Sequence, residues 1–171
     1  ALYGFGRNES LLGDWLAPHR RRVHLASKCG MTGVDGRRVI DGRPETLRRT
    51  LDEALARLRV ERIDLYYLHR WDRAVPIEDS VGALADMVAA GKVGAIGLSE
   101  VSVATLRRAH AVHPIAAVQT EYSLWTRNAE LGVLEECRRI GAAFVAFSPV
   151  GRGFLAGGVA DPEALEPKDL R

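Results

Sequence analysis

Five polar side chains close five short apolar segments, and their types suit acid–base chemistry and cofactor binding. They are Lys28, His69, Ser99, Gln119 and Ser148. A lysine can alter the acidity of a neighbouring group, and a histidine can exchange a proton near neutral pH. Singly, a lysine at a strand end can extend to water and a lone histidine can be structural. Agreement among five segments favours one shared site.

The apolar segments have the length of strands and are separated by helical patterns. We expect strands at residues 22–28, 63–69, 95–98, 116–119 and 144–147, with a loop over 33–42. The first strand expectation rests on Val-His-Leu-Ala-Ser before the Cys29-Gly30 turn. The helices between the strands allow every strand to run parallel to the others.

The expected helices are marked by leucine spacing and by capping residues. They cover residues 9–17, the stretch from Pro44 to Leu58, residues 78–90, and two segments capped by Ser102 and Asn128. For the last helix we predict an inner face of Leu131, Leu134 and Cys137, with Gly141 after the final turn. The chain is therefore predicted to be an α/β protein.

Such an array can form a doubly wound sheet or an eight-stranded barrel. A dinucleotide-binding sheet carries G-x-G-x-x-G after an early strand, and no such spacing follows any predicted strand here. The glycine-containing loop after Gly30 also lacks that spacing. Polar residues at the carboxyl ends of successive strands are instead typical of a barrel, whose active site lies at the face where those ends meet.

The composition favours small-molecule chemistry. Of the 171 residues, 47% are hydrophobic and 27% are charged, with 24 basic and 22 acidic side chains. This balance argues against a nucleic-acid or anionic membrane partner. No apolar run is long enough for a membrane span. Cys29 and Cys137 are far apart and lack metal-ligand spacing, so we expect reduced thiols in a cytoplasmic protein with no metal.

Several motifs, in order, resemble those of the aldo-keto reductase family. The matching stretches are Ala1-Leu2-Tyr3-Gly4, Asn8-Glu9, Ala26-Ser27-Lys28, Asp64 to His69, Gly91 to Ser99, Gln119 with Glu121-Tyr122, and Phe147-Ser148-Pro149 with Gly151-Arg152-Gly153. The resemblance covers residues 3 to about 157. It implies a partial (β/α)8 TIM barrel, with strands three to seven and their helices present.

The resemblance also implies how the chain is organised. Residues 1–171 would be one incomplete barrel domain, in which 1–21 form the loop and helix after an absent second strand. Residues 158–171 would begin a mobile loop before an absent eighth strand. We expect this internal fragment alone to show little or no activity, because a barrel lacking three strands cannot close.

The resemblance assigns catalytic roles to Tyr3, Lys28 and His69. Tyr3 would be the general acid that protonates the carbonyl oxygen, and the Lys28 ammonium would make its phenol a stronger acid. His69 would hydrogen-bond the substrate oxygen. An aspartate that pairs with the lysine is expected just before Ala1. Without these partners, Tyr3 could simply be an aromatic loop residue.

The same resemblance implies an NADP(H) site at the strand ends. Ser99 and Gln119 would hold the nicotinamide carboxamide, and Phe147, where many relatives have tyrosine, would stack on the ring. The pyrophosphate would contact the loop residues Ser148, Val150 and Arg152. Glu100 departs from the asparagine of many relatives, so it is either a cofactor-site residue or a solvated carboxylate.

The expected function is reduction of aldehydes or ketones to alcohols by hydride transfer from NADPH. One alternative is a non-catalytic or weakly catalytic NADP(H)-binding regulatory subunit on the same scaffold. A second is a barrel enzyme with a phosphate site and no need of nicotinamide. The identity of the carbonyl substrate does not follow from the sequence, because barrel specificity depends on loops. Trp125 could line a substrate pocket or pack within its loop.

Overall fold

The fold is seen in a computed structural model that describes residues 3–34, 37–159, 161, 165–166 and 169. Its main sheet contains β1 (Ala26–Cys29), β4 (Ile63–Leu68), β5 (Val93–Ser99), β6 (Ile115–Glu121) and β7 (Ala143–Phe147). All neighbouring strands in this sheet are parallel, and their order is β1-β4-β5-β6-β7. Strand order therefore follows chain order across the sheet.

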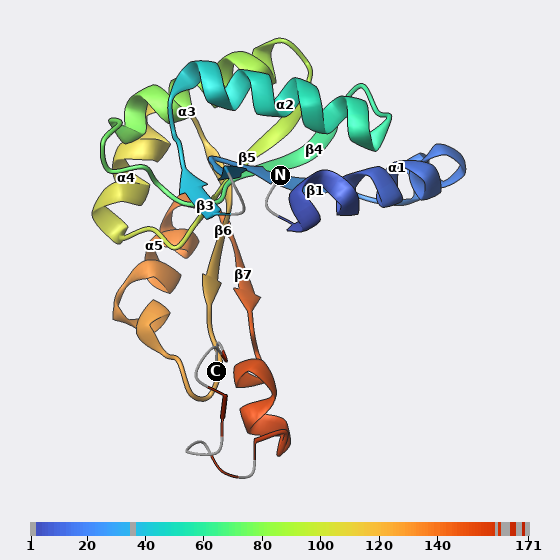
Figure 1. The fold of residues 1–171 in the computed structure, drawn as a ribbon. Coiled ribbons are helices and arrows are strands. Elements are labelled where there is room, and N and C mark those ends of the chain that lie inside the picture. Colours follow the sequence, from blue (N-terminus) through green and yellow to red (C-terminus); the bar gives the residue numbers. More distant parts are fainter. Residues whose placement is uncertain (1–2, 35–36, 160, 162–164, 167–168, 170–171) are drawn as a thin grey trace.

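One helix, α1 (Arg7–His19), precedes β1. The helices that connect the parallel strands are α2 (Pro44–Leu58), α3 (Ile77–Ala89), α4 (Val103–Val112) and α5 (Val133–Ile140). Short 3-10 turns lie at η1 (Tyr3–Gly6), η2 (Arg20–Arg22), η3 (Asn128–Leu131) and η4 (Gly151–Ala156). Consecutive helices from α1 to α4 pack side by side, and Figure 1 shows them following the outside of the sheet.

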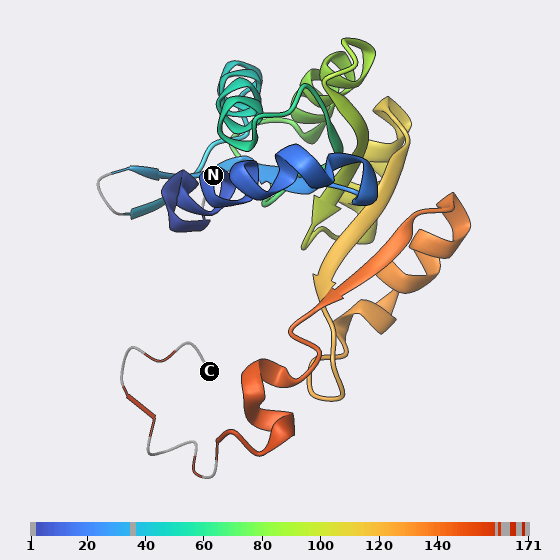
Figure 2. The ribbon, with the colours of Figure 1, turned by 90° about the vertical axis from the view of Figure 1, so that its right-hand side faces the viewer.

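This topology is that of a barrel segment. A doubly wound sheet reverses its strand order at a switch point and places helices on both faces. Here the order never reverses, and the helices follow one side of a curving sheet (Figures 1 and 2). The predicted α/β class and partial barrel with five parallel strands are confirmed.

The core lies between the sheet and these helices. Its fully buried side chains include Leu47, Leu51 and Leu58 of α2, Ile63, Tyr66 and Leu68 of β4, and Ile96 and Leu98 of β5. Burial of such side chains supplies most of the driving force for folding. It also fixes the strand register, because a shift by one residue would turn each strand's apolar set to the opposite face.

Local signals placed several element ends correctly. The Ser102 side chain accepts a hydrogen bond of 3.2 Å from the Thr105 backbone N–H, so it is the predicted N-cap of α4. Gly141 ends α5 in the left-handed conformation, with φ of 73°. Pro44 occupies the first turn of α2, where its missing N–H is not needed.

The predicted loop over 33–42 is wrong in part. Residues in this stretch form an antiparallel hairpin of β2 (Met31–Val34) and β3 (Arg37–Ile40). The sequence signal for it was Asp35-Gly36, a dipeptide that favours tight hairpins. Those two residues lie outside the described part of the chain.

The predicted start of the last helix is also wrong. Asn128 begins η3 rather than capping α5, and Gly132, at φ of 148°, separates the two segments. As a result Leu131 is 89% exposed instead of lying on an inner face, whereas Cys137 is buried as predicted. The first strand also begins at Ala26, four residues later than expected, with η2 ending at Arg22 and residues 23–25 in an irregular connection.

Most of the predicted loop over 158–171 falls on residues outside the described part of the chain. Within the described residues, no helix combines the length and the hydropathy that a membrane crossing requires.

Candidate active site

The structure brings the three predicted catalytic side chains together. Tyr3 comes from η1, Lys28 from the end of β1, and His69 directly follows β4. Lys28 Nζ donates a hydrogen bond of 3.2 Å to Tyr3 Oη. The rings of Tyr3 and His69 stack with centroids 5.9 Å apart and planes at 29°. All three line a cavity of about 140 Å³ at the strand ends.

The backbone around this cluster fixes its geometry. The His69 N–H donates to the Cys29 carbonyl at 2.9 Å, which joins the ends of β1 and β4. In register, Lys28 pairs with Tyr67, one residue before the last pair of that ladder. Gly4 and Gly6 adopt φ of 58° and 98°, a conformation that suits glycine, and so let the chain turn from Tyr3 into α1.

Burial and positive charge keep His69 neutral. Its side chain is buried, and desolvation is the main cause that lowers its pKa from 6.5 to about 4. The cations Lys28, Arg70 and Arg38 lower the pKa further. Within the described residues no side-chain hydrogen bond engages the imidazole. A neutral ring next to Tyr3 has one N–H to donate and one nitrogen to accept.

A second polar group lies at the ends of β5 and β6. Ser99 and Gln119 are register partners on these adjacent strands, and Ser99 is only 2% exposed. Glu100, at φ of 55°, accepts a hydrogen bond of 2.7 Å from the Glu121 backbone N–H through Oε1. Glu100 thus belongs to this cluster through its carboxylate, although its side chain is exposed. The cluster offers a hydroxyl, an amide and a carboxylate within a small region.

The loop after β7 carries the remaining predicted residues. Phe147 ends β7, four strands away from β1 in the sheet, and Ser148, Val150 and Arg152 follow it. Ser148 and Arg152 adopt positive φ of 52° and 55°. Figure 2 shows this loop and η4 at the far end of the sheet from α1. The structure therefore divides the predicted site residues into clusters at opposite ends of the open sheet.

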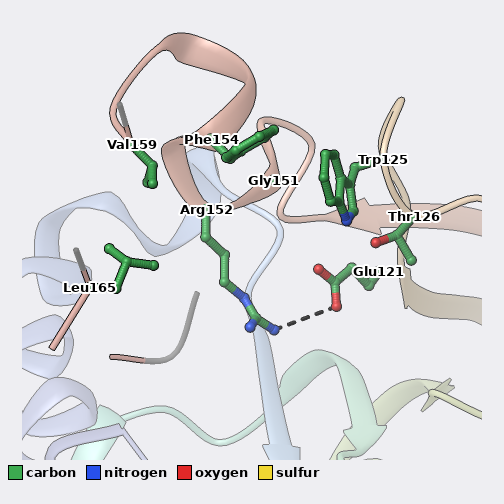
Figure 3. A pocket seen from close by; sticks show the side chains of 8 residues that line it. All are labelled: Glu121, Trp125, Thr126, Gly151, Arg152, Phe154, Val159 and Leu165. Atoms are coloured by element: carbon green, nitrogen blue, oxygen red, sulfur yellow. Dashed lines mark hydrogen bonds and ion pairs between the residues drawn. The ribbon is translucent and has the colours of Figure 1, made fainter. Parts of the chain in front are cut away.

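A larger cavity, of about 380 Å³, adjoins this loop. Figure 3 shows Arg152 reaching toward Glu121, and the two form an ion pair of 3.5 Å. Trp125 lines the same cavity and packs edge-on against Phe154, with centroids 4.6 Å apart. Trp125 thus lines a cavity and packs against η4, and a role in binding substrate stays a prediction.

Two further kinds of site find no support in the described residues. No cluster of three or more His, Cys, Asp or Glu side chains there could hold a metal ion. Cys29 and Cys137 are buried as free thiols, and burial raises the pKa of Cys29 to about 12, which keeps it protonated.

Comparison with known proteins identifies the family. The model of the aldo/keto reductase family matches residues 1–171. The chain belongs to this family. A Glycine max protein named probable aldo-keto reductase 1 is 48% identical over 159 residues, which are 91% of this chain and 46% of that protein.

Solved structures of other aldo/keto reductases share the fold. A glycerol dehydrogenase from Gluconobacter oxydans matches with a TM-score of 0.90 and 33% identity, over 99% of this chain and 53% of that one. A Bacillus halodurans aldo-keto reductase in its holo form matches with a TM-score of 0.83 and 25% identity, over 98% and 55%. The chain thus spans about half the length of these relatives.

Sequence reasoning missed a buried carboxylate that braces this candidate site. Glu9, 6% exposed, accepts a hydrogen bond of 2.8 Å from Ser27 Oγ and pairs with Arg57 Nε at 2.8 Å. A Cβ on Gly6 would stand 3.0 Å from Arg57 Cδ, so the start of α1 lies directly against this pair. The pair ties α1, β1 and α2 together beside Tyr3.

The neutral state of His69 can be tested directly. Because its pKa is lowered to about 4, we expect its ring proton shifts in the full-length protein to stay constant from roughly pH 5.5 to 8. The unfolded chain takes up the proton near pH 6.5, so His69 should lower the free energy of unfolding as pH falls from 6.5 toward 4. NMR with His69→Gln for assignment measures the shifts, and a midpoint near 6.5 would contradict this assignment.

Proposed function

We propose that the full-length protein reduces aldehydes or ketones by hydride transfer from NADPH, with Tyr3 as the general acid. The observation that carries the proposal is the hydrogen bond of 3.2 Å from the Lys28 ammonium to the Tyr3 hydroxyl, with the neutral His69 stacked on the same ring. A tyrosine held by a cation on one side and facing an open cavity on the other is suited to give up its proton.

The three side chains have separate tasks in this reaction. NADPH, when bound, supplies a hydride to the carbonyl carbon. The Tyr3 hydroxyl gives its proton to the carbonyl oxygen, and the Lys28 ammonium stabilises the phenolate that remains. The neutral imidazole of His69 donates its N–H to the same oxygen and so orients the carbonyl. Tyr3 recovers a proton from water before the next turnover.

The strand ends suit a nicotinamide carboxamide, which has one acceptor oxygen and one NH₂ donor. Ser99 has a hydroxyl to donate, Glu100 has only acceptor oxygens, and the Gln119 amide can do either. We propose that these residues hold the carboxamide, that Phe147 offers its π face to the ring, and that the loop with Ser148, Val150 and Arg152 holds the pyrophosphate. To bind a phosphate oxygen, the Arg152 guanidinium would have to give up part of its ion pair with Glu121.

We further propose that residues 1–171 are one part of a single barrel domain, with 1–21 leading into β1 and 158–171 leading out of η4. Support comes from the five strands, which run in barrel order, and from the coverage of about half of each relative.

Isotope transfer tests the proposed reaction. The full-length protein would be given a panel of aldehydes and ketones with NADPH deuterated at C4 on one face or the other. We expect deuterium at the carbinol carbon of the product from one face only, because a fixed nicotinamide presents a single face. Deuterium lost to water would exclude direct hydride transfer. Tight NADPH binding without turnover on the panel would instead favour the regulatory alternative.

A further inference from the structure

Arg70 joins two parts of the candidate site, the end of β4 beside Tyr3 and the end of β5 at Ser99. It directly follows His69, and its Nη1 donates to the His69 carbonyl oxygen at 2.6 Å and to Ser99 Oγ at 3.0 Å. The side chain thereby links the end of β4, where the substrate oxygen would lie, to the end of β5. Ser99 is 2% exposed, so little water competes for its hydroxyl.

The guanidinium of Arg70 makes no ion pair within the described residues. None of the carboxylates described lies within 4.0 Å of it, whereas Arg57 and Arg20, which are similarly half-buried, both pair with carboxylates. A half-buried cation is costly unless its hydrogen bonds are useful or its charge is balanced. Its hydrogen-bond partners among the described residues are a carbonyl and a hydroxyl, both of which can accept.

The hydrogen bond from Arg70 determines whether the Ser99 hydroxyl donates or accepts toward other groups. A guanidinium has five donors and no acceptor, so Ser99 Oγ must accept in this pair. A serine hydroxyl has two lone pairs and one proton, and the proton is then left to be donated elsewhere. Without Arg70 the hydroxyl could donate to the His69 carbonyl or to another acceptor. Ser99 is therefore held as a donor.

We propose that Arg70 is a positioning residue that acts through Ser99 to select one face of the nicotinamide ring. This inference rests on the proposed function. With Ser99 as donor and Glu100 as acceptor, a carboxamide fits with its oxygen toward Ser99 and its NH₂ toward Glu100. A ring turned by 180° about its glycosidic bond would carry the carboxamide to the opposite side and away from Ser99 and Glu100. Both hydrogen bonds would then be lost.

A double-mutant cycle in the full-length protein tests the route through Ser99. Arg70→Met and Ser99→Ala are each expected to raise the NADPH dissociation constant about tenfold, as for loss of one hydrogen bond to a charged or buried partner. The double variant should bind no more weakly than Ser99→Ala alone, because the two changes remove the same contact. Fluorescence quenching by NADPH measures binding without any turnover. The control is Arg49→Met, which changes an exposed side chain of α2 and should leave NADPH binding unchanged.

The second readout is the face from which hydride leaves. With C4-deuterated NADPH, Arg70→Met should yield a measurable share of product labelled from the wrong face, which a merely structural defect would not cause. If Arg70→Met does not fold, Arg70→Lys and Arg70→Gln decide the matter. Both keep a polar contact, but only lysine is donor-only, so Lys should keep the wild-type face selection and Gln should lose it.

The failures are distinguishable. Suppose that the wild type binds NADPH, but that the increases in dissociation constant caused by Arg70→Met and Ser99→Ala multiply in the double variant. The proposed role of Arg70 would then be wrong, and the proposed function would stand. Equal face selection in Arg70→Lys and Arg70→Gln would also overturn the role of Arg70. Wild-type protein that binds no NADPH would overturn both.

Discussion

Replacing Tyr3 by phenylalanine in the full-length protein is expected to lower kcat for carbonyl reduction by about 10²- to 10⁴-fold, the usual contribution of a general acid. The phenyl ring keeps its stacking with His69 but has no proton to give to the carbonyl oxygen. The NADPH dissociation constant should stay within about twofold of the wild-type value, since Tyr3 acts on the substrate. Steady-state kinetics and fluorescence titration measure the two quantities.

Tyr66→Phe is the matched control for Tyr3→Phe. Tyr66 lies on β4, and its buried side chain belongs to the core between the sheet and the helices rather than to the candidate site. The same loss of a hydroxyl there should leave kcat within about twofold, although it can change stability. If Tyr3→Phe turned over as fast as the wild type, the proton would come from another group and the assignment of Tyr3 would be wrong.

The order of elements was predictable because hydrophobic spacing and capping residues are local. Pro44, Ser102 and Gly141 act through the turn in which they lie, so their sequence neighbours were enough to place them. One error arose where a glycine changed the path of the chain, because Gly132 interrupts the last helix. Another was the hairpin of β2 and β3, which was predicted as a loop.

The proposed catalytic cluster was predictable in part because the carboxyl ends of parallel strands meet at one face. Lys28 and His69 could be grouped on that ground, but Tyr3 entered only through the family resemblance. The bracing contacts were not predictable. Arg57 reaches Glu9 over 48 residues and Arg70 reaches Ser99 over 29, and such pairs depend on helix packing and strand register. No local pattern encodes either distance.

These contacts show how an open sheet holds an ordered cluster. The surroundings of the proposed catalytic side chains are held by three sets of contacts. Lys28 donates to Tyr3, Glu9 with Arg57 holds the start of α1, and Arg70 donates to the His69 carbonyl at the end of β4. The cluster at Tyr3 therefore depends on β1, β4, α1 and α2, which pack together directly. Among the described residues, the loop after β7 shows no comparable packing on α1 or α2.

Replacing Lys28 by methionine in the full-length protein should lower kcat by about 10²- to 10³-fold at neutral pH, as when one donor to a developing anion is lost. Methionine retains most of the aliphatic stem, whereas the ammonium that donates to Tyr3 Oη is gone. The phenolate that forms as Tyr3 gives up its proton then lacks its cation. KM and the NADPH dissociation constant should change far less than kcat.

The control for Lys28→Met is Lys92→Met, which removes an exposed ammonium paired with Asp52 on the outside of the barrel segment. That change should leave kcat within about twofold, because a surface ion pair contributes little. Lys28→Arg separates charge from geometry. A guanidinium restores the cation but donates in a planar fork on a different stem, so we expect only partial recovery of kcat. Wild-type kcat in Lys28→Met would show that the tyrosine needs no cation, and would remove the contact on which the proposed function rests.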